Sequence, residues 1–323
     1  MINRSFWLKR LNDGWEKRQL VWISGVRRSG KTTLCKMIPG AVIMNCDLPS
    51  VSRQLKDPEY FFSNLPEGTT VIFDEIQRLD DPSIVLKIGT DEFPNLRILA
   101  TGSSTLEATK KFRDSLTGRK IQPFLPPVLW NECINDFGIP DFDKRLLYGG
   151  LPEFLLSEAK LGELYSEWID SYYARDIQEL FNVRNRIGFL KLMNLLFIQS
   201  GGIMEITSLV KESGLSRPTV MAHIEAMSVA HTITLIHPFF GGGKKEIVKR
   251  PKVYAFDTGF ITHVRGWTEI RETDRGILWE HLVLDMLRVA YDTVYYWTDK
   301  DKNEVDFIMK VEKGEVHIIV CKI

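Results

Sequence analysis

Short apolar runs alternate with helical stretches over residues 18 to about 125. The apolar runs are LVWISG, AVIMNCD, TVIFDE and LRILATG, and each is long enough for one strand. Strands joined by helical crossovers are typical of a parallel sheet. We therefore predict an α/β fold with a parallel sheet in this part of the chain. An amphipathic helix is expected ahead of it, because apolar residues recur at near-helical spacing at Phe6, Leu8, Leu11 and Trp15.

The pattern becomes helical and aromatic after residue 130. Residues 131–200 follow helical spacing until Gly201 and Gly202 interrupt the run. A short helix–turn–helix pattern extends to about residue 229, and strand-like segments follow it. The part from Gly276 onward contains one helix and three strand candidates.

The composition says little about the function or partners of the protein. The 323 residues contain 42 Lys plus Arg and 42 Asp plus Glu, so the chain has no overall field that would attract nucleic acid or a membrane. Any nucleic-acid contact must come from a local patch. The four cysteines are far apart and form no CxxC pair, which predicts buried thiols in a reducing compartment. No apolar stretch approaches the roughly 18–20 residues that span a bilayer, and the N-terminus lacks the features of a secretory signal, so we expect a cytoplasmic protein.

A phosphate-binding motif follows the first predicted strand. The segment Gly25–Thr32 satisfies GxxxxGK[ST], comes directly after an apolar strand and opens a predicted helix. Its glycines let backbone N–H groups face a phosphate, Lys31 reaches the β- and γ-phosphates, and the Thr32 hydroxyl binds magnesium. The sequence therefore predicts binding of ATP or a close relative with Mg²⁺. The expected contact residues are Gly25, Val26, Arg27, Arg28, Ser29, Gly30, Lys31, Thr32 and Thr33.

A second acidic motif completes this site. Val71–Phe73 form an apolar strand that ends in Asp74 and Glu75, at the sheet edge where ligands bind in such folds. We expect Asp74 to hold the magnesium ion through water and Glu75 to orient or activate an attacking water. An acid at the second position favours hydrolysis over phosphate transfer to another substrate.

Two further catalytic candidates lie downstream. Ser103 follows the predicted strand LRILATG and is the candidate that senses the γ-phosphate, with an ordinary Ser-Gly turn as the alternative. Arg119 is the candidate arginine finger, acting within a subunit or between subunits, with an ordinary surface arginine as the alternative. The second mode of action would require a homo-oligomer.

A helix–turn–helix pattern and a basic hairpin follow Gly201-Gly202. Ile206–Val210 begins the first helix, and Ser216 caps the second. The second helix carries few polar side chains for reading bases: Arg217, Thr219 and His223. The hairpin is richer, with five basic residues against Glu246 alone: Lys244, Lys245, Lys249, Arg250 and Lys252. This pattern fits contact with a DNA backbone and fits a protein-docking module equally well.

The motifs together resemble a family of prokaryotic AAA-type ATPases that carry a C-terminal domain of unknown function. The resemblance covers essentially the whole chain and is carried by GVRRSGKTT, VIFDEIQ, TGSS, LTGR, SYYARDI and WEHLVLD…NEVDFI…CK. It implies four parts: an ATPase domain over 1–130, a helical lid over 131–200, a winged helix over 201–265 and a truncated restriction-endonuclease-like module over 266–323.

The last part departs from the pattern of an active nuclease. Glu280, Asp306 and Lys322 match three positions of the restriction-type metal site. Val320 stands where an acid two residues before the lysine is needed, so one carboxylate is missing. The sequence also stops at Ile323, before the elements that complete this fold. We therefore expect a docking surface or a truncated product, and no nuclease activity.

The leading interpretation is an ATP-hydrolysing AAA-type switch coupled to the C-terminal interaction module. The alternatives are a nucleotide-regulated DNA-binding protein and a protein-docking scaffold with an inactive nuclease-like tail. Arg175 and Asp176 are read as a structural ion pair or, alternatively, as a nucleotide contact. The sequence leaves open what the ATPase acts on and whether adenine or guanine is preferred.

Overall fold

The computed structural model describes residues 2–102, 116–240, 250–299, 301, 303–311 and 315–322. The chain divides into two compact units, Met1–Leu125 and Pro126–Ile323. In the described residues, no helix is long and apolar enough to cross a membrane.

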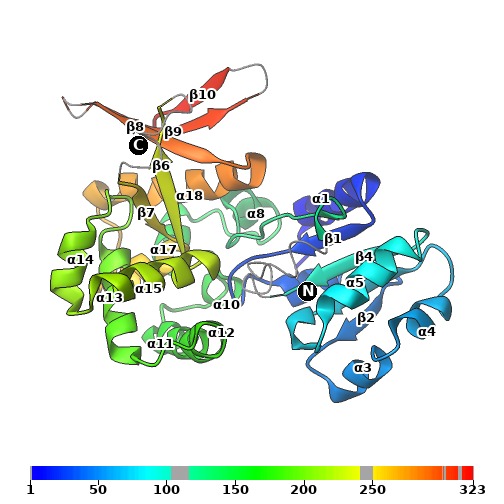
Figure 1. The fold of residues 1–323 in the computed structure, drawn as a ribbon. Helices are drawn as coiled ribbons and strands as arrows, with labels where there is room; N and C mark the ends of the chain where they lie inside the picture. Colours follow the sequence, from blue (N-terminus) through cyan, green and yellow to red (C-terminus); the bar gives the residue numbers. More distant parts are fainter. Residues whose placement is uncertain are drawn as a thin grey trace. The chain divides into compact units, whose positions relative to one another are not determined.

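The first unit is built on a five-stranded sheet in the order β2-β3-β4-β1-β5, with all strands parallel (Figure 1). The strands are β1 (Leu20–Ile23), β2 (Val42–Asn45), β3 (Thr70–Asp74), β4 (Arg97–Thr101) and β5 (Lys120–Ile121). The helices are α1 (Ser5–Lys17), α2 (Lys31–Cys35), α3 (Pro49–Gln54), α4 (Pro58–Ser63) and α5 (Pro82–Asp91), with a short 3-10 helix η1 (Ile76–Arg78). The predicted α/β fold with a parallel sheet is confirmed.

The strands of this sheet form on uninterrupted apolar runs because both faces are covered. Every residue of β1 is buried, and Trp22 and Phe73 pack with Phe62 of α4 in the central cluster. Helix α1 packs on β1, where a Cβ at Gly14 would lie 3.1 Å from Val21. The buried residues of α1 are Trp7, Leu11 and Gly14. Of the predicted apolar stripe, only Leu11 is fully buried, and Trp7 and Gly14 take the places expected for Leu8 and Trp15.

The second unit combines helices with a second sheet, ordered β10-β9-β8-β6-β7. Its helices are α8 (Trp130–Asn135), α9 (Phe142–Tyr148), α10 (Pro152–Leu155), α11 (Gly162–Tyr172), the π-helical η2 (Tyr173–Gln178), α12 (Glu179–Phe181), α13 (Arg186–Ile198), α14 (Ile206–Ser213), α15 (Arg217–Val229), α17 (Thr258–Val264) and α18 (Glu272–Ala290). Its strands are β6 (Ile233–Pro238), β7 (Lys252–Ala255), β8 (Val294–Thr298), β9 (Glu304–Lys310) and β10 (Val316–Ile319). Helix α18 packs on this sheet through Val283, Leu284 and Leu287.

One sheet joins segments that were predicted to belong to different parts of the chain. Strand β6 lies in the predicted winged helix and pairs in parallel with β8 of the predicted nuclease-like module, at His237–Tyr295 and Pro238–Tyr296. Helices α14 and α15 lie at the predicted positions, and Ser216 Oγ accepts a hydrogen bond from Thr219 N at the start of α15.

A buried carboxylate connects distant segments of the second unit through hydrogen bonds. Asp257 is 3% exposed and accepts hydrogen bonds from Gly150 N at 2.6 Å and Gly259 N at 2.8 Å. Arg145 is buried nearby and donates to Val128 O at 3.0 Å. Burial raises the pKa of Asp257, while Arg145 and the backbone N–H groups oppose that shift.

Replacing Asp257 with Ala is expected to lower the free energy of unfolding by about 3 kcal/mol, since Arg145 would lose its buried countercharge and two N–H groups their acceptor. Urea denaturation followed by tryptophan fluorescence measures this loss, because Trp168 stacks on the neighbouring Phe256 at 4.8 Å. The exposed Asp292 provides the control, and Asp292→Ala should change stability by less than about 0.5 kcal/mol. Equal stabilities of the two variants would contradict the assigned role.

Candidate nucleotide-binding site

The loop between β1 and α2 has the backbone geometry of an anion cradle. Gly25, Arg28 and Gly30 have positive φ angles of 153°, 62° and 96°. A Cβ at Gly25 would lie 2.4 Å from Leu125 O, so only glycine fits there. Left-handed positions in a short loop at a helix N-terminus turn successive N–H groups toward one point, where an anion can bind.

Two buried polar side chains of the loop, Ser29 and Lys31, lie at the cradle. The Ser29 hydroxyl is buried and, among the described residues, has no hydrogen-bond partner. Lys31 is 9% exposed, and its Nζ donates to Gly25 O and Val26 O, both at 2.9 Å. The ammonium group therefore folds over the loop and places a positive charge beside the cradle.

Strand β4 brings a hydroxyl to the acidic residues. It lies between β1 and β3, and its register pairs Ala100 with Phe73, so Thr101 is the next residue beside Asp74. Thr101 Oγ1 donates to Asp74 Oδ1 at 2.6 Å and accepts from Glu75 N at 3.1 Å. Thr101 is thus the polar residue at the end of β4 that hydrogen-bonds to the Asp74 side chain and to the Glu75 backbone, a role that the sequence pattern did not indicate.

The Glu75 carboxylate is held in a defined position. Its backbone has φ 56°, a left-handed conformation that costs a non-glycine residue about 1–3 kcal/mol and is concentrated at functional sites. Gln77 Nε2 donates to Glu75 Oε2. The Gln77 side chain also lies against the end of β4, where a Cβ at Gly102 would be 2.8 Å from Gln77 Oε1.

The neighbouring cysteines are inert. Burial and the nearby Asp74 carboxylate raise the pKa of the Cys35 thiol. The same two causes raise the pKa of Cys46 to about 12. All four cysteines are free; Cys35, Cys46 and Cys133 are buried, and Cys321 is half-buried.

The remaining predicted site residues differ in exposure and in their contacts. Thr32 and Thr33 are exposed on the first turn of α2, whereas Asp74 is buried. Ser103 lies outside the described residues. Arg119 makes a two-pronged ion pair with Asp91 of α5, at 2.7 Å and 3.0 Å. A role as an arginine finger would require this pair to open.

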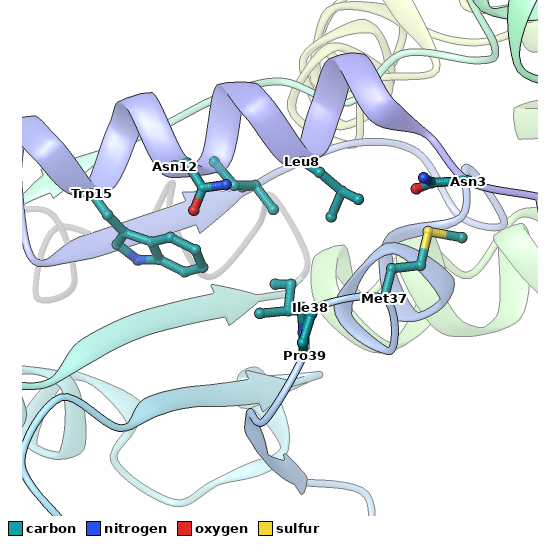
Figure 2. Close-up of a pocket in the computed structure, with 8 residues that line it drawn as sticks. Asn3, Leu8, Asn12, Trp15, Met37, Ile38 and Pro39 are labelled. Atoms are coloured by element: carbon teal, nitrogen blue, oxygen red, sulfur yellow. The ribbon is translucent and has the colours of Figure 1, made fainter.

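An apolar pocket of about 450 Å³ lies in the same unit. Figure 2 shows Leu8, Asn12 and Trp15 of α1 facing Met37, Ile38 and Pro39, which follow α2. Asn3 lines one end of the pocket. Apolar walls with a few polar groups are typical of sites for small molecules.

The donors suit a magnesium ion bound together with phosphate. In the described parts of the chain, no group of three or more His, Cys, Asp and Glu side chains could hold a metal ion. Mg²⁺ needs fewer protein ligands, because it keeps several waters and is bound by one or two oxygen donors plus the substrate phosphates. The Thr32 hydroxyl and the Asp74 carboxylate are donors of this type.

Thr101→Val removes the hydroxyl and keeps the side-chain shape. We expect ATP turnover to fall by at least about tenfold, because Asp74 and the Glu75 backbone each lose a hydrogen bond, and stability to fall by about 1–3 kcal/mol. Phosphate release and urea denaturation measure the two effects. Thr90→Val, which removes a hydroxyl from α5, is the control. Unchanged turnover in Thr101→Val would show that this hydroxyl does not support the acids.

Comparisons with known families divide the chain into three segments. Residues 17–134 match the family described as an AAA domain. Residues 139–271 match a domain of unknown function (DUF8612), and residues 275–323 match another (DUF4143).

Relatives that match most of this chain occur in bacteria and archaea. An uncharacterized protein of Mycobacterium tuberculosis is 25% identical over 325 residues, which is 96% of this chain and 72% of that protein. An uncharacterized protein of Methanocaldococcus jannaschii is 25% identical over 362 residues, covering 99% of this chain and 77% of that protein. Among solved structures, the Walker-type ATPase paby2304 of Pyrococcus abyssi has a TM-score of 0.50 at 17% identity, covering 82% of this chain and 96% of that one. The last likeness shows a shared P-loop fold.

Proposed function

We propose that this chain, which belongs to the prokaryotic AAA-type ATPases with a C-terminal domain of unknown function, hydrolyses ATP with Mg²⁺ as a molecular switch. The observation that carries the proposal is the hydrogen-bonded set of Asp74, Glu75 and Thr101 in the unit that contains the anion cradle. Hydrolysis, rather than nucleotide binding alone, is favoured by Glu75, because a second carboxylate beside the metal ligand can orient water.

Each residue has a distinct role in this proposal. The N–H groups of Gly25–Lys31 and the Lys31 ammonium neutralise the phosphates. Thr32 and Asp74 would hold the magnesium ion, which supplies further neutralising charge when bound. Glu75 accepts the proton of the attacking water or orients that water. Ser103 stays the candidate γ-phosphate sensor. Thr101 holds the Asp74 side chain and the Glu75 backbone in place through its hydroxyl.

The apolar pocket supplies a place for the nucleobase. It is lined by residues that follow α2, the helix opened by the phosphate cradle, and by Asn3 and Asn12. Among the described residues that line this pocket, none carries a carboxylate, the group that would pair with the N1–H and N2–H donors of guanine. Adenine is therefore the base we propose.

A second candidate role concerns partners of the second unit. The face of α15 gives little support for reading DNA. His223 is 7% exposed with its ring 5.3 Å from Phe189, and the helix exposes the anionic Glu225 as well as Arg217. Of the predicted wing cations, Lys244, Lys245 and Lys249 lie outside the described residues. Arg250 pairs with Glu205, and the buried Lys252 pairs with Glu304.

Protein docking is the better supported of the two partner roles. Strand β10 forms an edge of its sheet and exposes apolar side chains, with Ile318 57% exposed. A nuclease role gains no support. Val320, which stands where a nuclease needs an acid, is half-exposed and neutral. The backbone N–H of the next residue, Cys321, donates to Asp306, one of the predicted metal ligands, at 2.6 Å.

A turnover assay with and without duplex DNA tests both candidates. We expect Mg²⁺-dependent release of phosphate from ATP, changed less than about twofold by DNA at moderate salt. Absent turnover would refute the ATPase. Stimulation by DNA that falls steeply with salt, and falls further in Arg217→Ala, would favour the DNA-binding alternative over docking.

A further inference from the structure

The phosphate cradle is held from outside by an arginine near the N-terminus. Arg4 directly precedes α1 and is only 3% exposed. Its Nη1 donates to Ser29 O at 2.9 Å across 25 residues of sequence. The guanidinium carbon lies 5.9 Å from the centre of the Trp7 ring.

Burial of this group calls for an explanation. A guanidinium stays charged at all accessible pH values, and burying it carries a desolvation penalty. Here the arginine contacts a backbone carbonyl of the residue that precedes Gly30 and Lys31. The Arg4 guanidinium at Ser29 O thus adds a second fixed positive charge next to the cradle, besides the Lys31 ammonium.

The bond fixes the orientation of one peptide unit. Ser29 C=O and Gly30 N–H belong to the same planar trans peptide and point in opposite directions. Gly30 has φ 96° and is the residue that caps α2. Peptides beside a glycine rotate readily, because glycine tolerates both signs of φ. With Ser29 O held toward Arg4, the Gly30 N–H is directed away from Arg4.

We propose that Arg4 is a positioning residue of the phosphate cradle, which holds the Ser29–Gly30 peptide so that the Gly30 N–H can donate to a bound phosphate. This inference rests on the proposed binding of ATP at Gly25–Thr32. Arg4 also follows Asn3, which lines the apolar pocket, so one N-terminal segment contributes to both the phosphate cradle and the proposed base pocket.

Three substitutions separate orientation from charge: Arg4→Ala removes the donor, Arg4→Gln keeps a neutral donor, and Arg4→Lys keeps a charged donor. Isothermal titration calorimetry with Mg-ATP gives the dissociation constant of each folded variant, and thermal unfolding without nucleotide gives its melting temperature. We expect Arg4→Ala to weaken ATP binding by about tenfold or more, and Arg4→Lys to recover most of this loss. Lys9→Ala, an exposed cation on α1, is the control and should bind as the wild type does.

The outcomes separate the inference from the function on which it rests. A wild type that does not bind ATP would refute the proposed function. If the wild type binds ATP and the Arg4 variants bind it equally well, with only a lower melting temperature, the residue is structural and the inference is wrong. If Arg4→Ala does not fold, Arg4→Met, which keeps the apolar stem and has no donor, takes its place. Weaker ATP binding by Arg4→Met than by both Arg4→Gln and Arg4→Lys supports the inference. Wild-type affinity of Arg4→Met overturns it, and so does a loss in Arg4→Gln as large as that in Arg4→Met, because the charge alone would then matter.

Discussion

Glu75→Gln is expected to lower the ATP turnover number by at least about a hundredfold, the usual contribution of a general base. The amide has the shape of the carboxylate but cannot accept a proton from water. ATP affinity should change by less than about threefold, since the proposed phosphate contacts come from the loop and Lys31 and not from Glu75. Steady-state phosphate release and calorimetric titration measure the two quantities on the same preparation.

Glu92→Gln is the matched control, because Glu92 is an exposed carboxylate of the same unit, just after α5. It should leave turnover and affinity unchanged. Equal turnover of wild type and Glu75→Gln would reject Glu75 as the residue that acts on water. A parallel loss of ATP affinity would instead point to a defect in the cradle.

Lys31→Ala is expected to weaken ATP binding by at least about a hundredfold and to remove turnover with it. The ammonium is held at the cradle by Gly25 O and Val26 O, so the variant deletes a nearly buried charge that would face the phosphates. Calorimetric titration with Mg-ATP measures the loss. Lys36→Ala removes an exposed lysine from the C-terminal end of α2 and serves as the control. Binding by Lys31→Ala at wild-type affinity would mean that the nucleotide is held elsewhere.

The four long strands of the first unit could be predicted because each is a continuous apolar run. Strand β5 was missed, since Lys120–Ile121 is only a two-residue strand and is half-buried. Strand order is a property of the pairing, which apolar runs do not encode. For that reason the sequence indicated hydroxyls at the end of β4 but did not identify Thr101 as the one beside Asp74.

Residues whose partners are distant in sequence were the hardest to predict. A polar residue ahead of a first helix is typical of a solvated terminus, so Arg4 gave no signal before its contact with Ser29 was known. Lys252 was counted with the basic wing, yet it is 5% exposed and pairs with Glu304 of β9. Local charge counting fails there because the countercharge comes from another strand of the sheet.

The pairing of β6 with β8 has a mechanical consequence. Backbone hydrogen bonds connect the strand after the helix–turn–helix directly to the C-terminal hairpin β8–β9. Segments linked in this way open together, since separating them breaks a continuous ladder of bonds. A displacement transmitted to α14 and α15 would therefore reach the exposed edge strand β10 through the shared sheet.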